Sequence, residues 1–87
     1  MINNSLKAFP DLRGLLKKYN MTYDDFAKLI GVSLNCATLK LNNKVGFSLS
    51  ECVKTRNYFR LRGEIDITAD KLFFDWMSTI VDKRTAI

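Results

Sequence analysis

Hydrophobic side chains recur at helical spacing from the first turn onward in this chain of 87 residues. Pro10 and Asp11 suit a first helical turn, where the missing N–H of proline costs no hydrogen bond and an acidic side chain meets the positive end of the helix dipole. The apolar positions that follow are three and four residues apart, as on one face of a helix: Leu12, Leu15, Leu16 and Tyr19. We expect this first helix to end near Asn20.

The next stretch, residues 22–44, predicts two short helices joined by a tight turn. Thr22 followed by Asp25 is an acidic version of the capping box that begins helices. Gly31 is the kind of residue that ends a helix in the left-handed conformation. Ser33 follows almost at once and is expected to cap the second helix.

Within this second helix, Ala37 and Leu41 are four residues apart and should face the core. The outer side is then formed by Leu34, Asn35, Thr38 and Asn42. Asn43 tolerates the left-handed conformation and is expected to end the helix. Two helices joined by a short glycine-containing turn describe a helix-turn-helix, whose second helix enters the DNA major groove. The alternative is an ordinary helical hairpin in a small all-α domain.

Two more helices are predicted in the rest of the chain. Ser48 and Glu51 form a second capping box, and the helix that they begin should run to about Arg60. A loop follows, and Thr68 or Asp66 should cap a fifth helix whose apolar side is made of Leu72, Phe73, Trp76, Met77 and Ile80. We therefore predict a compact all-α fold of five helices. Residues 1–87 form one domain, with a core over about 10–77 and a C-terminal tail or helix extension over 78–87.

Basic side chains are concentrated in the part of the chain that holds the two short helices. Between Arg13 and Arg62 there are ten Lys or Arg residues and three acidic ones, whereas residues 63–87 carry three basic and five acidic residues. A local surplus of positive charge suits a polyanionic partner such as nucleic acid. The alternative is a solvated basic surface with no partner.

Several functional classes lack the residues that they need. The chain has no histidine and only two cysteines, Cys36 and Cys52, so neither a zinc site nor a His-activated nucleophile can be assembled. No secretory signal and no apolar run long enough to span a bilayer are present. We expect a cytoplasmic protein that is not an enzyme, needs no metal or cofactor, and keeps its cysteines reduced.

Three short stretches of sequence resemble a known family. These are Gly-Val-Ser at 31–33, Ala-Thr-Leu-Lys-Leu-Asn-Asn-Lys at 37–44 and Phe-Ser-Leu-Ser-Glu at 47–51. They resemble the lambda-repressor-like, Cro/C1-type helix-turn-helix regulators, and in particular small phage and prophage regulators of Gram-positive bacteria. The resemblance covers roughly residues 12–74. It implies a five-helix domain in which the second and third helices read DNA in a bacterial host.

The resemblance also implies roles for individual residues. Base edges are expected to meet Ser33, Leu34, Asn35 and Thr38, and phosphates to meet Tyr23, Lys28, Asn42 and Lys44. Tyr23 stands where many family members have Gln, at the helix N-terminus that faces the DNA backbone, and Asn43 replaces the usual Gly. Leu34 and Leu39 occupy positions that are often polar or basic. A leucine there can contact a thymine methyl group or mark a protein-binding patch.

The sequence thus predicts a sequence-specific DNA-binding transcriptional regulator, either a repressor or a Cro-like protein. The alternative, motivated by the two leucines, is a helix-turn-helix-fold module that binds and modulates a partner repressor. Because DNA sites are commonly read by dimers, we also expect a homodimer formed through Phe74, Met77 and Val81, which lie at helical spacing. The competing interpretation is that the C-terminal aromatic residues complete the monomer core, with Trp76 at its centre.

Overall fold

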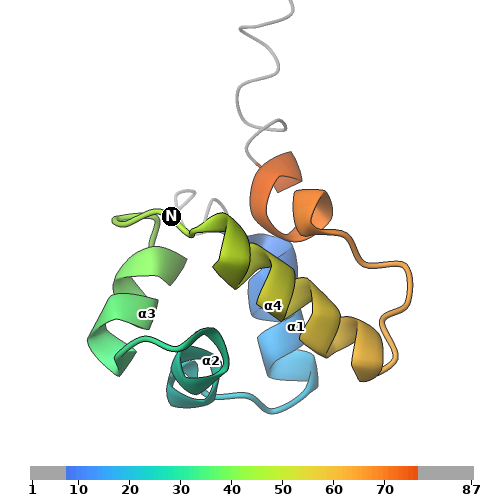
Figure 1. Cartoon of the computed structure of the whole chain (residues 1–87), viewed down its shortest axis with the longest axis horizontal. Helices are drawn as coiled ribbons and strands as arrows, with labels where there is room; N and C mark the ends of the chain where they lie inside the picture. The colour runs from blue at the N-terminus through green and yellow to red at the C-terminus, as the bar shows by residue number, and fades with distance from the viewer. Residues whose placement is uncertain (1–7, 77–87) are drawn as a thin grey trace, which may run out of the picture.

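Residues 8–76 are described by the computed structural model, and every regular element in that range is helical (Figure 1). The elements are α1 (Pro10–Lys18), α2 (Tyr23–Ile30), α3 (Leu34–Leu41), α4 (Leu49–Leu61) and the π-helix η2 (Asp70–Phe74). The predicted all-α fold of five helices is confirmed over this range. None of these helices has the length and apolar character needed to cross a membrane.

Both capping boxes predicted from the sequence are present at the starts of α2 and α4. At α2, the hydroxyl of Thr22 accepts from the Asp25 N–H at 3.1 Å, and the Asp25 carboxylate accepts from the Thr22 N–H at 3.0 Å. Ser48 and Glu51 make the same reciprocal pair at α4, at 3.1 and 2.9 Å. These bonds satisfy N–H groups that have no partner within a helix, so both starts are fixed by local chemistry.

Left-handed residues follow three of the helices and reverse the chain. They are Asn20 after α1, Gly31 after α2 and Asn43 after α3, with φ of 56°, 80° and 60°. In each case the next N–H donates back across the last turn, as from Lys44 to the Leu39 carbonyl at 2.8 Å. The predicted ends of α1, α2 and α3 are therefore confirmed.

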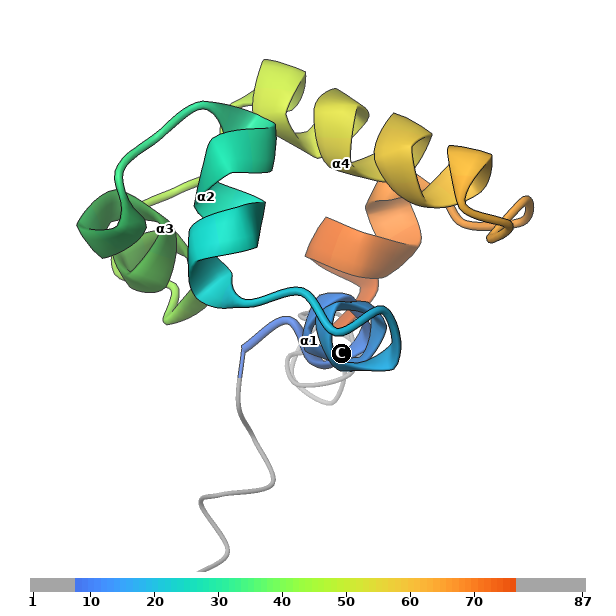
Figure 2. The same ribbon diagram turned by 90° about the horizontal axis from the view of Figure 1, so that it is seen from below.

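The core is built from all parts of the described chain. α2 packs against both α3 and α4, and α1 packs against η2 (Figures 1 and 2). The ring of Phe47, just before α4, meets the rings of Phe9, Phe26 and Phe73 in edge-on contacts at 5.2, 6.0 and 4.8 Å between centroids. This aromatic cluster joins the segment before α1, helix α2 and η2 in one core.

The last helix differs in type from the predicted one. Thr68 caps it, accepting from the Lys71 N–H at 3.1 Å, which decides between the two predicted caps. The helix then widens into a π-helix, with the Asp75 N–H donating to the Asp70 carbonyl. Leu72 and Phe73 are buried as expected.

Trp76 does not occupy the centre of the core. It is half-buried at the edge, 5.1 Å from the Phe9 ring, and the largest fully buried side chains are Phe26, Phe59 and Phe73. Of the expected dimer residues, Phe74 is 48% exposed, and Met77 and Val81 lie outside the described residues.

Candidate functional site

The outer side of α3 is exposed along its whole length. The turn of Gly31, Val32 and Ser33 positions its start, where the Ser33 hydroxyl accepts from the Cys36 N–H at 3.1 Å. Ala37 and Leu41 are fully buried on the inner side, as predicted. Of the four residues expected to face bases, Ser33, Leu34 and Asn35 are exposed and Thr38 is half-buried.

Polar groups on this outer side have hydrogen-bonding capacity to spare. The Asn35 amide makes no hydrogen bond within the described part of the chain, so its oxygen and both N–H groups are available. The Thr38 hydroxyl donates to the Leu34 carbonyl at 2.9 Å, which leaves its oxygen as an acceptor. The Ser33 oxygen accepts at the cap, which leaves its O–H as a donor. Such groups can make directional contacts to a ligand laid along α3.

Arg13 on α1 connects the N-terminus of α2 with the C-terminus of α3. Its guanidinium donates to the Tyr23 hydroxyl, to the Leu41 carbonyl at 2.6 Å and to the Asn42 side-chain oxygen at 3.0 Å. A further bond from its Nε reaches the Ala8 carbonyl at 2.7 Å. Sequence reasoning missed this role because the side-chain partners lie 10 and 29 residues away.

The Arg13 cluster brings two predicted phosphate-contacting residues to one place. A guanidinium can only donate, so the Tyr23 and Asn42 oxygens must accept from it. The Tyr23 O–H and the Asn42 amide N–H groups then remain as donors. Lys44 follows two residues after Asn42, exposed and without an ion pair in the described part of the chain. This end of α3 can therefore offer neutral donors and a cation to an anion.

Lys28 is not part of this arrangement. Its ammonium lies 3.3 Å from the Asp24 carboxylate one turn earlier on α2, and both side chains are exposed. Such surface pairs contribute little to stability and are screened by salt. The structure thus brings Tyr23, Asn42 and Lys44 near the end of α3 and leaves Lys28 elsewhere on α2.

Lys40 is turned inward, although it is the only charged residue within α3. It is 7% exposed, with its ammonium 3.0 Å from the Glu51 carboxylate and 2.7 Å from the Gly46 carbonyl. Burial opposes the charged form of Glu51, but hydrogen bonds from Ser48 and the neighbouring Lys40 outweigh it and hold the pKa of Glu51 below its ordinary 4.5. Lys40 therefore ties α3 to α4, and the count of basic residues overstates the positive charge that α3 presents.

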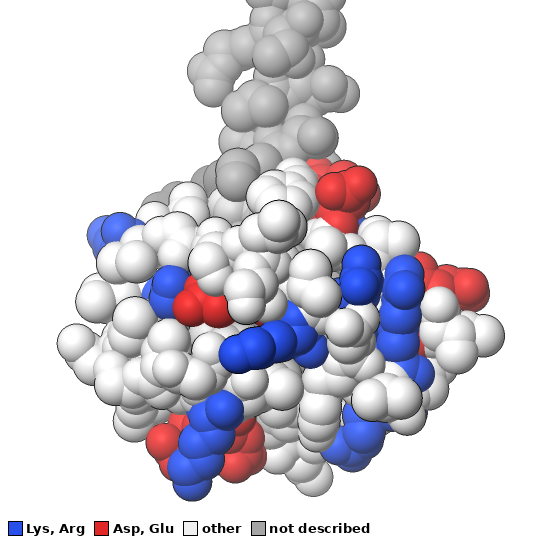
Figure 3. Space-filling view, viewed as in Figure 1, with Lys and Arg blue, Asp and Glu red and all other residues white. Residues whose placement is uncertain are grey.

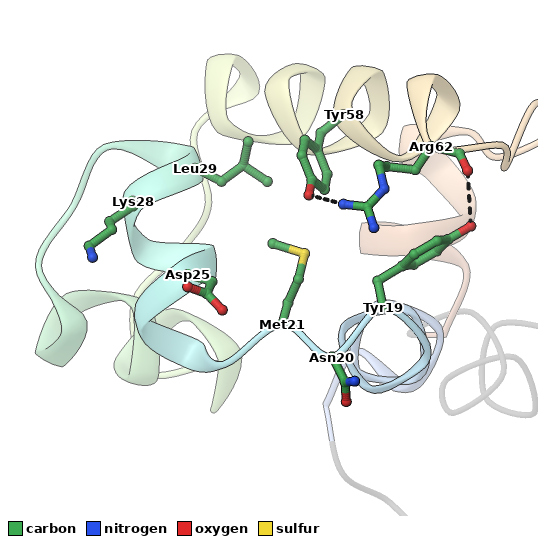
Figure 4. A pocket seen from close by; sticks show the side chains of 8 residues that line it. All are labelled: Tyr19, Asn20, Met21, Asp25, Lys28, Leu29, Tyr58 and Arg62. Carbon is green, nitrogen blue, oxygen red and sulfur yellow. Dashed lines mark hydrogen bonds between the residues drawn. The ribbon is translucent and has the colours of Figure 1, made fainter.

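A groove of about 500 Å³ lies between α2, α4 and the end of α1 (Figure 4). Tyr19 and Tyr58 flank the Arg62 guanidinium, whose central carbon is 4.8 and 5.5 Å from their ring centroids, and Met21 projects into the groove beside them. α2 separates the groove from α3 (Figures 2 and 4). The charge of Arg62 is thus committed to two aromatic rings on a different side of the molecule.

The surface reflects this distribution of charge. In the view of Figure 3, most Lys and Arg side chains lie over α2 and α4, and the edge beside α3 is largely uncharged. No cluster of three or more potential metal ligands occurs within residues 8–76. Comparison with family models, with curated proteins and with solved structures found no match to this chain.

Proposed function

We propose that the protein is a sequence-specific DNA-binding transcriptional regulator in which α2, the turn at 31–33 and α3 act as a helix-turn-helix. The observation that carries the proposal is the outer side of α3, where the exposed Asn35 has no hydrogen-bonding partner within residues 8–76 and Ser33 and Thr38 supply further polar side chains. The helix is eight residues long, or about 12 Å, which suits the width of the major groove. The sequence resemblance to lambda-repressor-like regulators supports the same function.

The DNA backbone would be bound at both ends of this unit. At the N-terminus of α2 the capping box already satisfies the Asp25 N–H, so the contact to a phosphate there would come from the Tyr23 hydroxyl, which is held by Arg13. Beyond the C-terminus of α3, Asn42 donates through its amide and Lys44 supplies charge. Lys28 would add only longer-range attraction, because Asp24 neutralises it. This function needs no catalytic group, metal or cofactor, and it would be carried out in the cytoplasm of a bacterial host.

A titration of DNA at several salt concentrations tests the proposal. Labelled duplexes from the regions flanking the gene would be compared with random duplexes of the same length. We expect tighter binding to one flanking duplex and an affinity that falls linearly on a log–log plot as salt rises. Binding that shows neither a preferred duplex nor a dependence on salt would rule out this function.

A second candidate is a protein-interaction module that binds a partner repressor. Leu34 is 48% exposed, Leu39 37% and Val45 42%, so α3 and the segment after it present apolar as well as polar surface. An interface centred on these side chains would lose little affinity as salt rises, because burial of apolar surface is not screened. The same salt series therefore separates the two functions. Leu39→Glu would weaken a protein complex strongly.

A further inference from the structure

The side of α3 that faces solvent carries no charged side chain. Lys40, the only charged residue in the helix, is engaged with Glu51 and Gly46. Lys44 lies beyond the end of the helix, and the first turn at Leu34 is about 12 Å away along the axis. No lysine or arginine of α3 can therefore reach a base edge from its exposed side.

This absence limits which bases α3 can distinguish. Guanine is most often recognised by the paired donors of Arg or Lys, adenine by the amide of Asn or Gln, and thymine by apolar contact with its methyl group. The exposed first turn of α3 offers the Asn35 amide and the Leu34 side chain, which project about 100° apart around the helix axis. Thr38 lies one turn beyond Leu34, with its hydroxyl already donating to the Leu34 carbonyl. These groups match adenine and thymine and lack the usual partners of guanine.

We infer that the DNA site of this protein consists of A·T pairs at the positions covered by the first turn of α3. Asn35 bonds the edge of an adenine, and Leu34 packs on the methyl group of a neighbouring thymine. The inference rests on the proposed function, since it specifies the class of DNA sequence that the same helix recognises. Leu34 becomes a specificity-determining residue, in place of the polar or basic side chains often found at this position in the similar regulators.

Selection from a random duplex library, followed by removal of single methyl groups, tests this inference. The full chain would enrich bound duplexes at moderate salt, and each thymine of the enriched site would then be replaced by deoxyuridine, which lacks only the methyl group. For the wild type we expect at least one position where the replacement weakens binding about fourfold, the effect of about one methyl group returned to water.

Two variants test whether the loss of affinity on removal of a thymine methyl group depends on Leu34. In Leu34→Ala the same replacement should change affinity less than about twofold, because the contact is already lost. Leu61→Ala, at the exposed end of α4, is the matched control and should keep the full effect. Both leucines are at least 48% exposed, so neither change removes core packing, and circular dichroism would check folding.

The possible failures are distinct. An enriched site with guanine at the positions covered by α3, or a methyl effect that persists in Leu34→Ala, would overturn the inference and leave DNA binding intact. A library from which no sequence is enriched, with weak binding to all duplexes, would reject the proposed function and this inference with it.

Discussion

Asn35 lies in the first turn of α3 and Asn42 follows its last turn. The two side chains are the same, but their surroundings leave different hydrogen-bonding groups available. Asn35 has no partner in the described part of the chain, so its amide can both donate and accept. The Asn42 oxygen accepts from Arg13 at 3.0 Å, which leaves the N–H groups of this amide as the donors for a ligand. One amide is suited to an adenine edge, which requires a donor and an acceptor together. The other is suited to a phosphate, which only accepts.

Asn35→Ala should therefore reduce discrimination and spare non-specific affinity. We expect a loss of about 1–3 kcal/mol in the preference for the operator over random DNA, measured by competition binding. Asn57→Ala on α4, whose amide accepts from Arg56, is the control and should leave that preference unchanged. Equal losses on operator and random DNA would show that Asn35 does not read a base.

Lys44→Ala should act on all DNA sequences alike. Its ammonium is exposed and has no ion pair within residues 8–76, so it can displace a counterion from a phosphate. We expect the slope of log affinity against log salt to decrease in magnitude by about one. Lys54→Ala, at an exposed lysine on α4, should leave the slope almost unchanged. If both variants change the slope equally, the effect reports net charge and not a contact.

Among the helices, α4 depends on a capping box whose half-buried Glu51 also pairs with the buried Lys40. The Glu51 carboxylate accepts from the Ser48 N–H at 2.9 Å and lies 3.0 Å from the Lys40 ammonium. It therefore fixes the start of α4 and the position of α3 at once.

Ser48→Ala removes one half of this box. The Glu51 N–H loses its side-chain acceptor, and we expect the free energy of unfolding to fall by about 0.5–2 kcal/mol, measured by urea denaturation. DNA affinity per folded molecule should stay the same, since Ser48 does not lie on the outer side of α3. If stability is unchanged and DNA binding falls, then Ser48 is a phosphate ligand and its capping role is minor.

The pH dependence of the free energy of unfolding tests the contribution of Glu51, the other member of the capping box. Because the folded-state pKa of Glu51 lies below its ordinary 4.5, the unfolded chain binds the proton more readily. The stabilisation is complete above about pH 4.5 and is lost as the pH falls through the folded-state value. The thermal midpoints of the wild type and Glu51→Gln should thus differ most near neutral pH and converge in acid. A constant difference down to about pH 3 would contradict this assignment.

The starts and ends of these helices could be predicted because they depend on residues that are close together in sequence. The boxes at Thr22 and Ser48, and the left-handed ends at Asn20 and Asn43, involve residues within one or two turns of each other. The outer side of α3 followed from its periodicity for the same reason. Arg13 and Lys40 could not be assigned in this way. Each of these two side chains contacts a carbonyl or carboxylate that is distant in sequence, and local helical patterns do not indicate which distant group will lie within reach.

For the molecule as a whole, η2 and α3 lie apart, with α3 at the left edge and η2 at the top of Figure 1, so a second copy could bind at η2 and leave α3 free. Phe74 on η2 is 48% exposed and is the only aromatic residue among the exposed large apolar side chains of the described range. The segment from residue 63 onward also carries more acidic than basic side chains, which makes it a poor surface for DNA. We propose that Phe74 lies in a homodimer interface, with Met77 and Val81 as the neighbouring contacts expected from the sequence.

Sedimentation equilibrium over a wide concentration range tests the dimer. The wild type should shift from monomer to dimer as its concentration rises, and Phe74→Lys should stay monomeric because burying an unpaired ammonium is costly. Leu61→Lys, on another exposed apolar side chain, should dimerise like the wild type. A wild type that remains monomeric at high micromolar concentration without DNA would reject a free dimer.

The cluster around Arg13 also restricts how this protein can diverge. As long as position 13 is an arginine, which only donates, position 42 must supply an acceptor and position 23 a hydroxyl or its equivalent, so the three positions should covary among homologues. The first turn of α3 takes no part in the cluster. If α3 reads DNA as proposed, mutation of Leu34 and Asn35 would change the preferred DNA sequence, while the donors proposed to bind phosphates stay in place.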